Sequence, residues 1–436
     1  MDIYTTNLTL LLGLCGALFA TQRKSSPPSS KTSTKQNAHK ANQTPFYTVY
    51  ALVMASDWLQ GPFLYPLYHD EHGLSSSLVS TLFTTGFISG AISGSLIGSL
   101  ADRKGRKAAC LAFCVAYALS CVLTTIPSLP LLFAGRVLGG LGTSLLFSVF
   151  ESWMVADFGR RKLADKGGDL GRTFGAMSTI NSVVAIASGV GSEWLVGVAG
   201  TRKAPFWGSV GLVGAAGCVI AAFWDENYGE TGTDETKKGG EKKKKETKSV
   251  WEVLFSPKVL SLGLASTIFE GSMYLFVFFW TPALRSVQTY QGSLPYGVIF
   301  ASFMAATLAS SLAFGVITSR KLLGYSTLLL AILGTSALSF LLSASPKSEQ
   351  SAFWVFCLFE AAVGMYFPCM GSLKGQLVDD SVRAQVYGML RVPLNVFVVV
   401  SLLITGGGGN FGRVFIVCAS LLTAATGAVW AVSHRR

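Results

Sequence analysis

Residues 98–107 read Gly-Ser-Leu-Ala-Asp-Arg-Lys-Gly-Arg-Lys and separate two apolar stretches, 78–100 and 107–126. Each stretch is long enough for a helix that crosses a bilayer, which takes about 20 residues. The basic segment is therefore expected to be a tight turn between two membrane helices. We expect Gly98 to let two helices approach closely and Asp102 to accept hydrogen bonds at a neighbouring helix N-terminus. We therefore predict that this segment acts as a gate that holds one conformation closed, with a plain basic turn as the alternative. The candidate gating residues are Gly98, Asp102, Arg103, Gly105 and Arg106.

Apolar stretches of this length recur along most of the chain. Half of the 436 residues are hydrophobic, 13% are charged, and the mean hydropathy is +0.48, which excludes an ordinary soluble domain. The predicted fold class is an all-α polytopic membrane protein. Breaks at glycine, proline and charge clusters predict core helices near 47–68, 78–100, 107–126, 129–154, 173–198, 205–223, 257–283, 295–317, 322–343, 350–371, 383–405 and 411–431.

One further apolar segment, near 5–20, precedes these helices. No basic residue stands before it, and Ala-Leu-Phe-Ala at 17–20 is a poor signal-peptidase site. We therefore expect an uncleaved extra transmembrane helix at the N-terminus, with a cleaved signal peptide as the alternative.

The distribution of lysine and arginine predicts the orientation, because basic loops tend to stay cytoplasmic. With the core starting inside, the inside segments hold 28 of the 35 basic residues and the outside segments hold five. The C-terminus is then cytoplasmic, and the extra helix places the N-terminus on the exoplasmic side. This sidedness explains the net charge of +12 without nucleic acid as a partner. The default location is the cell membrane.

A charged linker divides the predicted helices into six and six, which is the layout of two repeated bundles. Both halves keep a glycine five residues before Arg-Lys, at Gly98 and at Gly315. The expected domains are an N-terminal segment and Ser/Lys linker, a first bundle, a cytoplasmic charged linker and a second bundle, at 1–46, 47–223, 224–256 and 257–436. The Lys-rich run in the linker is expected to be solvated. Contact with anionic lipid is the alternative.

No cofactor is expected. All eight cysteines lie in apolar segments and show no metal-ligand spacing, so we expect neither a disulfide framework nor a structural zinc. The chain has no nucleophile motif and no phosphate-binding glycine loop, and an enzyme is therefore not expected.

The basic turn at 98–107 matches the signature between helices 2 and 3 of the major facilitator superfamily, and Arg136 to Gly140 is similar to its R-x-x-x-G pattern. Several further stretches resemble the molybdate-anion transporter family of that superfamily. The resemblance implies two six-helix bundles, alternating access and molybdate as the substrate. The stretches are 56–65, 135–140, 150–153, 226–228, 278–282, 302–306, 366–368 and 391–394.

Ionisable residues inside membrane helices are candidate functional groups, because lipid penalises them. Asp57 and Glu270 lie near mid-depth in helices that correspond under the repeat, so each is a candidate proton carrier. A structural carboxylate, paired with arginine or backbone amides, is an equally weighted alternative. Glu360 and Arg136 are further coupling candidates. Arg136 is also a candidate for anion capture from outside, and its alternative is pairing with Asp57 or other polar groups of the first core helix.

Arg391 is the candidate for direct contact with an oxyanion, since a guanidinium donates two parallel hydrogen bonds to such a group. Its alternative is an ion pair with Glu360 or another carboxylate, which would stabilise the bundle. Asn181 lies at a comparable depth in the helix at 173–198, which corresponds under the repeat to the helix of Arg391, and it is a candidate to donate a further bond to the anion. An interhelical hydrogen bond is the favoured alternative for Asn181. Trp58 and Trp280 are candidate cavity residues, although most aromatics in such helices pack. Glu151 is a candidate for gating.

Three functions remain open. The first is molybdate uptake, with proton symport as the expected driving force. The second is proton-coupled transport of an organic solute such as a sugar, which several acids with aromatic neighbours would also suit. The third is a nutrient sensor or scaffold without net transport, in which the basic linker binds a partner.

Overall fold

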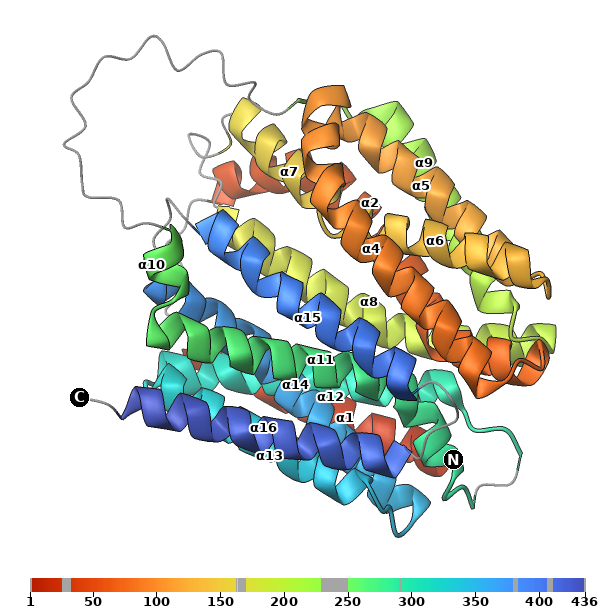
Figure 1. Cartoon of the computed structure of the whole chain (residues 1–436). Coiled ribbons are helices and arrows are strands. Elements are labelled where there is room, and N and C mark those ends of the chain that lie inside the picture. The colour runs from red at the N-terminus through yellow and green to blue at the C-terminus, as the bar shows by residue number, and fades with distance from the viewer. Residues whose placement is uncertain are drawn as a thin grey trace. The chain divides into compact units, whose positions relative to one another are not determined.

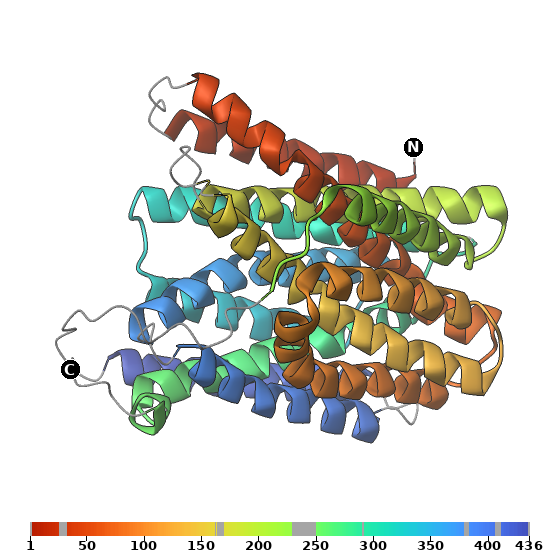
Figure 2. The ribbon, with the colours of Figure 1, turned by 90° about the horizontal axis from the view of Figure 1, so that it is seen from above.

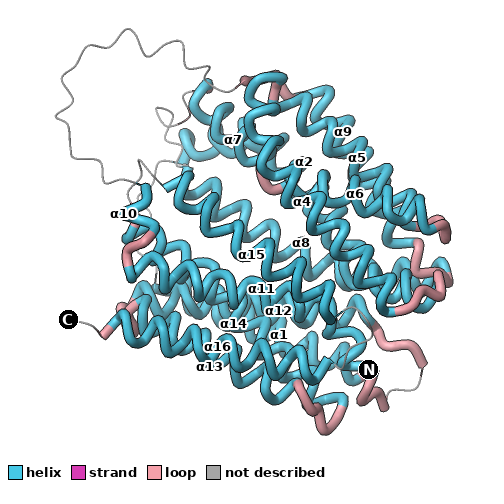
Figure 3. The backbone as a smooth tube through the Cα atoms, viewed as in Figure 1, coloured by secondary structure: helices cyan, strands magenta, loops and turns pink. Residues whose placement is uncertain are grey.

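The computed structural model describes residues 2–25, 33–161, 163, 170–228, 250–289, 292–378, 383–405 and 411–434. These residues form helices and loops and contain no strand (Figure 3). The helices are α1 Ile3–Ser25, α2 Ser33–Gln60, α3 Leu64–Pro66, α4 Ser76–Lys104, α5 Arg106–Thr124, α6 Leu129–Leu146, α7 Val149–Arg160, α8 Leu170–Ala199, α9 Ala204–Phe223, α10 Val250–Leu254, α11 Pro257–Arg285, α12 Tyr296–Ser319, α13 Tyr325–Ser343, α14 Glu349–Leu377, α15 Arg383–Thr405 and α16 Phe411–Ser433.

Among the described residues, twelve helices are long and apolar enough to cross a membrane. They include α1, so the extra helix predicted at the N-terminus is present. They do not include α2, whose first half is polar. The all-α polytopic fold class is confirmed.

The chain divides into two compact units. The N-terminal unit is Pro28–Glu241, and the C-terminal unit combines Met1–Pro27 with Lys242–Arg436. In the N-terminal unit α4 packs on α6, α5 packs on α6 and α9, and α2 packs on α8 and α9 (Figure 1). In the C-terminal unit α14 packs on α12 and α13, α16 packs on α13 and α11, and α15 packs on α11.

Small residues bring α4 and α6 together. A methyl group at Gly140 would meet the carbonyl oxygen of Gly86 and come within 2.7 Å of the amide nitrogen of Gly90. The Ser144 hydroxyl donates to the Gly90 carbonyl at 2.7 Å. A methyl group at Gly98 would meet no atom within 4 Å. The close approach expected at Gly98 therefore occurs two to three turns away, at Gly86 and Gly90 of the same helix.

The N-terminal helix α1 packs in the C-terminal unit along α12 (Figure 2). The buried Tyr4 hydroxyl donates to the carboxylate of Glu349, which is 4% exposed. The same carboxylate accepts from the backbone and side chain of Thr289, at 2.5 and 2.8 Å. Asn7 donates to Gln350 at 3.0 Å. Because its polar groups are matched by partners more than 340 residues away, α1 is an integral helix of this unit.

Three helices differ from their predicted bounds in ways that matter for the site. The helix expected at 47–68 begins at Ser33 and ends at Gln60; the Gly61-Pro62 pair then starts the 3₁₀ turn Gly61–Phe63. The helix expected at 129–154 is interrupted at Phe147 and Ser148, which separate α6 from α7. The helix expected to end at 371 continues to Leu377, which places Lys374 inside α14.

Candidate functional site

Polar side chains of α11, α14 and α15 gather in the C-terminal unit. We call Ser266, Glu270, Tyr366, Lys374 and Arg391 the charged cluster. The Lys374 ammonium donates to the Ser266 hydroxyl at 3.0 Å, and that hydroxyl donates to the Glu270 carboxylate at 2.7 Å. The Tyr366 hydroxyl donates to the same carboxylate oxygen at 2.9 Å. Glu270 is thus held by two hydroxyls, one of which also binds a cation.

Helical spacing explains why these residues meet. Ser266 and Glu270 are four residues apart on α11, and Tyr366 and Lys374 are eight apart on α14, so each pair shares one helix face. Phe269 stacks on the Tyr366 ring with 3.9 Å between centroids, which fixes that ring beside α11. The two helices therefore present their polar faces to one another.

Arg391 contributes the second cation of the cluster from α15. Its side chain is exposed, and no carboxylate of the described residues lies within the 4.0 Å that defines an ion pair. Lys374 interacts electrostatically with both Glu270 and Arg391. The ion pair with Glu360, considered as the alternative for Arg391, is not formed. Glu360 is buried and accepts from the Thr307 hydroxyl at 3.1 Å.

Lys374 is the site residue that sequence reasoning missed. The predicted helix ended at 371, so Lys374 was assigned to a cytoplasmic loop. Two features of the sequence would have found it. The helical pattern continues past 371 to Leu377, and Lys374 lies two turns after Tyr366 on the same face.

In the N-terminal unit, Asp57 of α2 is held by a tyrosine, as Glu270 is. The Tyr117 hydroxyl of α5 donates to Asp57 at 2.6 Å, and the Gln60 amide donates to Tyr117. The predicted substrate residues Trp58 and Asn181 are brought together, because the Trp58 indole donates to the Asn181 side-chain carbonyl at 2.8 Å. This is the interhelical hydrogen bond weighed as the alternative for Asn181.

Arg136, on α6, lies against α4. Its guanidinium donates to the Leu82 carbonyl at 3.3 Å and stands 5.3 Å from the centre of the Phe83 ring. No carboxylate in the described part of the chain pairs with it, so the expected alternative of an ion pair with Asp57 is absent.

The remaining two predicted residues differ in exposure. Trp280, on α11, is 6% exposed and makes an edge contact with Phe303 at 5.3 Å, so it packs within the C-terminal unit. Glu151 is exposed in the first turn of α7. The structure brings neither residue to the charged cluster, and their proposed roles remain predictions.

The basic turn at 98–107 is closed by a carboxylate from another part of the unit. Gly105 has φ +109° between α4 and α5, and Arg106 pairs with Asp102 at 2.8 Å. The amides of Lys107 and Ala108 at the N-terminus of α5 donate to Glu226, at 2.7 and 3.0 Å. Glu226 is therefore the carboxylate at the N-terminus of α5, and the contact expected of Asp102 at a neighbouring helix N-terminus stays a prediction.

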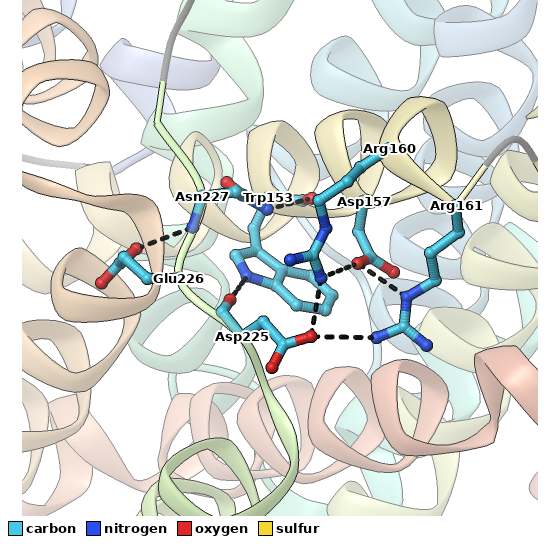
Figure 4. Close-up of polar contacts among 7 residues, drawn as sticks. All are labelled: Trp153, Asp157, Arg160, Arg161, Asp225, Glu226 and Asn227. Carbon is cyan, nitrogen blue, oxygen red and sulfur yellow. Dashed lines mark hydrogen bonds and ion pairs between the residues drawn. The ribbon is translucent and has the colours of Figure 1, made fainter.

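The segment after α9 is tied to α7 by a polar network (Figure 4). The Trp153 indole donates to the Asp225 carbonyl at 3.0 Å, and the Asn227 amide donates to the Trp153 carbonyl at 3.2 Å. Arg160 bridges Asp157 and Asp225 at 2.9 and 2.8 Å. The hydrogen bond and charge of Arg160 hold the pKa of Asp225 below its ordinary value. The stretches 150–153 and 226–228, far apart in the sequence, are therefore contact partners.

Comparison with known proteins agrees with this architecture. A family described as sugar transporters with 12 transmembrane segments matches residues 4–359. A molybdate-anion transporter of Xenopus tropicalis is 33% identical over 413 residues, which cover 90% of this chain and 85% of that protein. One of Danio rerio is 32% identical and covers 96% of this chain and 93% of its own length.

Solved structures support the same fold. A point mutant of the nucleoside transporter NupG superposes with a TM-score of 0.68 at 12% identity, and the match covers 89% of this chain and 98% of that one. At this identity the likeness concerns the fold alone. The family match over most of the chain and the relatives above 30% identity show the family, and the solved structures agree with its fold. This multi-pass membrane protein belongs to the molybdate-anion transporter family of the major facilitator superfamily.

Proposed function

We propose that this protein carries molybdate across the membrane by alternating access. Two relatives that match nearly all of the chain are named molybdate-anion transporters. The observation that carries the proposal is an exposed Arg391 that has no carboxylate ion-pair partner among the described residues and lies within electrostatic range of the half-buried Lys374. Arg391 is the proposed direct ligand, because its planar donors match two oxygens of a tetrahedral dianion.

Uptake of a dianion requires a driving force. An inside-negative potential opposes entry by about 2.3 kcal/mol per charge per 100 mV. Proton symport through Glu270 or Asp57 is the proposed source, because both carboxylates sit within helices and each accepts from a tyrosine hydroxyl. Glu360 and Arg136 are proposed to take part in coupling.

The proposed setting is the cell membrane, with the N-terminus outside and the C-terminus in the cytoplasm. The asymmetry of lysine and arginine supports this orientation. The Lys-rich part of the central linker, 230–248, lies outside the described residues, and its contact with anionic lipid stays a proposal. The basic turn at 98–107 is proposed to act as a gate, together with Glu151.

The test is uptake of labelled molybdate by cells that lack their own carrier. Arg391→Ala should abolish saturable uptake at equal surface expression. Arg413→Ala is the matched control, because it removes an exposed arginine of the same unit from the start of α16. Equal uptake by Arg391→Ala and Arg413→Ala would contradict a role for Arg391. Absence of uptake by the intact protein would overturn the function itself.

A sugar or related organic solute is the second candidate. The description of the matching family favours it, and the paired Trp58 and Asn181 would suit hydroxyl groups. Labelled sugars in the same cells decide between the two. Sugar uptake that excess molybdate does not inhibit would support the second candidate.

A further inference from the structure

The charged cluster contains a carboxylate and an ammonium that share one serine hydroxyl. Ser266 donates its proton to Glu270 and accepts from Lys374, so the hydroxyl is used in both directions. No direct ion pair joins Glu270 and Lys374 within the described residues. The Lys374 ammonium is thus linked to the Glu270 carboxylate through the Ser266 hydroxyl.

The charges of the cluster can be counted. With Glu270 ionised, Lys374 and Arg391 leave one net positive charge, whereas with Glu270 protonated they leave two. Several other ionisable groups on α11 and on the elements packed against it are tyrosines and cysteines, which are uncharged near neutral pH. They are Tyr366, Cys357 and Cys369 on α14, Tyr387 on α15 and Cys418 on α16, with Tyr274 on α11 itself.

The other charged groups of these elements stand at helix ends or have partners of their own. Lys258 and Arg285 lie at the two ends of α11, and Arg383 is the first residue of α15. Glu349 begins α14 and accepts from Tyr4 and Thr289. Glu252 of α10 precedes the start of α11 at Pro257, and Glu270 lies 13 residues beyond that start, which is about 20 Å of helix rise. Glu360 of α14 is occupied by Thr307. Arg413 stands in the first turn of α16 and His434 follows its end at Ser433.

The geometry points to a charge-matching switch: protonation of Glu270 frees Lys374 from its serine bridge, and Lys374 and Arg391 together then bind one tetrahedral dianion. The inference rests on the proposed function and deepens it. The proton comes from water and ends on a carboxyl oxygen of Glu270. Once Glu270 is neutral, its negative charge no longer attracts the Lys374 ammonium. The ammonium can then exchange the Ser266 hydroxyl for an oxygen of the dianion. Lys374 is the specificity-determining residue, since it supplies the second positive charge that a monoanion does not need.

Proton uptake on binding tests this switch. Sodium molybdate is titrated into the purified full-length protein by calorimetry, at several pH values and in buffers of different ionisation enthalpy. In the pH range where Glu270 is ionised, the intact protein should take up close to one proton per molybdate bound. Its affinity for molybdate should fall about tenfold for each unit by which the pH rises in that range. Glu270→Gln should bind without proton uptake and with an affinity that does not change with pH.

Lys374→Met should weaken molybdate binding by about 10- to 100-fold, which is the usual loss for a charge-assisted hydrogen bond. Lys258→Met is the matched control, because it removes an exposed lysine at the start of α11 and should leave binding unchanged. Glu270→Asp keeps the carboxyl and should keep proton uptake, which provides a second test if Glu270→Gln does not fold.

The two levels of the proposal fail differently. If the intact protein binds no molybdate at any pH, the proposed function is overturned. If it binds molybdate without proton uptake, or if Lys374→Met binds as tightly as the intact protein, the switch is overturned while the proposed function stands.

Discussion

Replacement of Gly105 by alanine should destabilise the N-terminal unit by two separable effects. The backbone at Gly105 has φ +109°, where an L-residue is strained by about 1–3 kcal/mol. The added methyl group would also stand 2.5 Å from the carboxyl carbon of Glu226 and 2.7–2.8 Å from its oxygens. To relieve that overlap, Glu226 must leave the amides of Lys107 and Ala108, at a cost of about 1.5–3 kcal/mol for a hydrogen bond to a charged group.

A double-mutant cycle separates the two effects. In a Glu226→Ala background the overlap is gone, so Gly105→Ala should cost only the backbone strain. The expected coupling between the two positions is therefore about 1.5–3 kcal/mol, measured as free energies of unfolding in mixed micelles. Gly98→Ala is the control in the same motif, because its methyl group meets no atom and alanine favours a helix by about 1 kcal/mol. The reasoning is refuted if Gly105→Ala costs the same with and without Glu226.

Three further predictions concern other contacts. Tyr4→Phe should lower the free energy of unfolding of the C-terminal unit by about 1.5–3 kcal/mol, because the buried Glu349 loses a charge-assisted hydrogen bond; an unchanged value in micelles would contradict it. Gly140→Ala should force α4 and α6 apart and reduce folded yield by size-exclusion chromatography, and a wild-type elution profile would refute the close contact. Asp225→Asn should flatten the acid side of the stability curve: Arg160 holds the pKa of Asp225 below 3.8, so the stability it contributes is present above that value and is lost as pH falls through the lower folded pKa. Thermal scans from about pH 2 to 7 check this, and equal acid sensitivity of both proteins would count against it.

The sequence alone predicted all twelve helices that are long and apolar enough to cross a membrane among the described residues, and the basic turn at 98–107. It also predicted a membrane helix at 47–68, where α2 is not one of the twelve. Hydropathy and charge asymmetry are local properties, so a window of about 20 residues suffices to recognise a span. The same reasoning proposed Glu270, Arg391 and Asp57 as candidates, because an ionisable group inside an apolar stretch stands out without any knowledge of its partners. It missed Lys374, since one more turn of α14 decides whether that lysine belongs to a loop or to a helix face.

Only the tertiary structure decided which groups bind one another. Glu226 reaches the amides at the start of α5 across more than 115 residues, and Tyr4 reaches Glu349 across 345. No local pattern marks such pairs, because a hydrogen bond depends on atoms within about 3 Å and not on position along the chain. For the same reason Lys374 and Glu270 became one site only after α11 and α14 were packed together. The sequence therefore determined that this protein is built of membrane helices, and packing determined which of their charges act together.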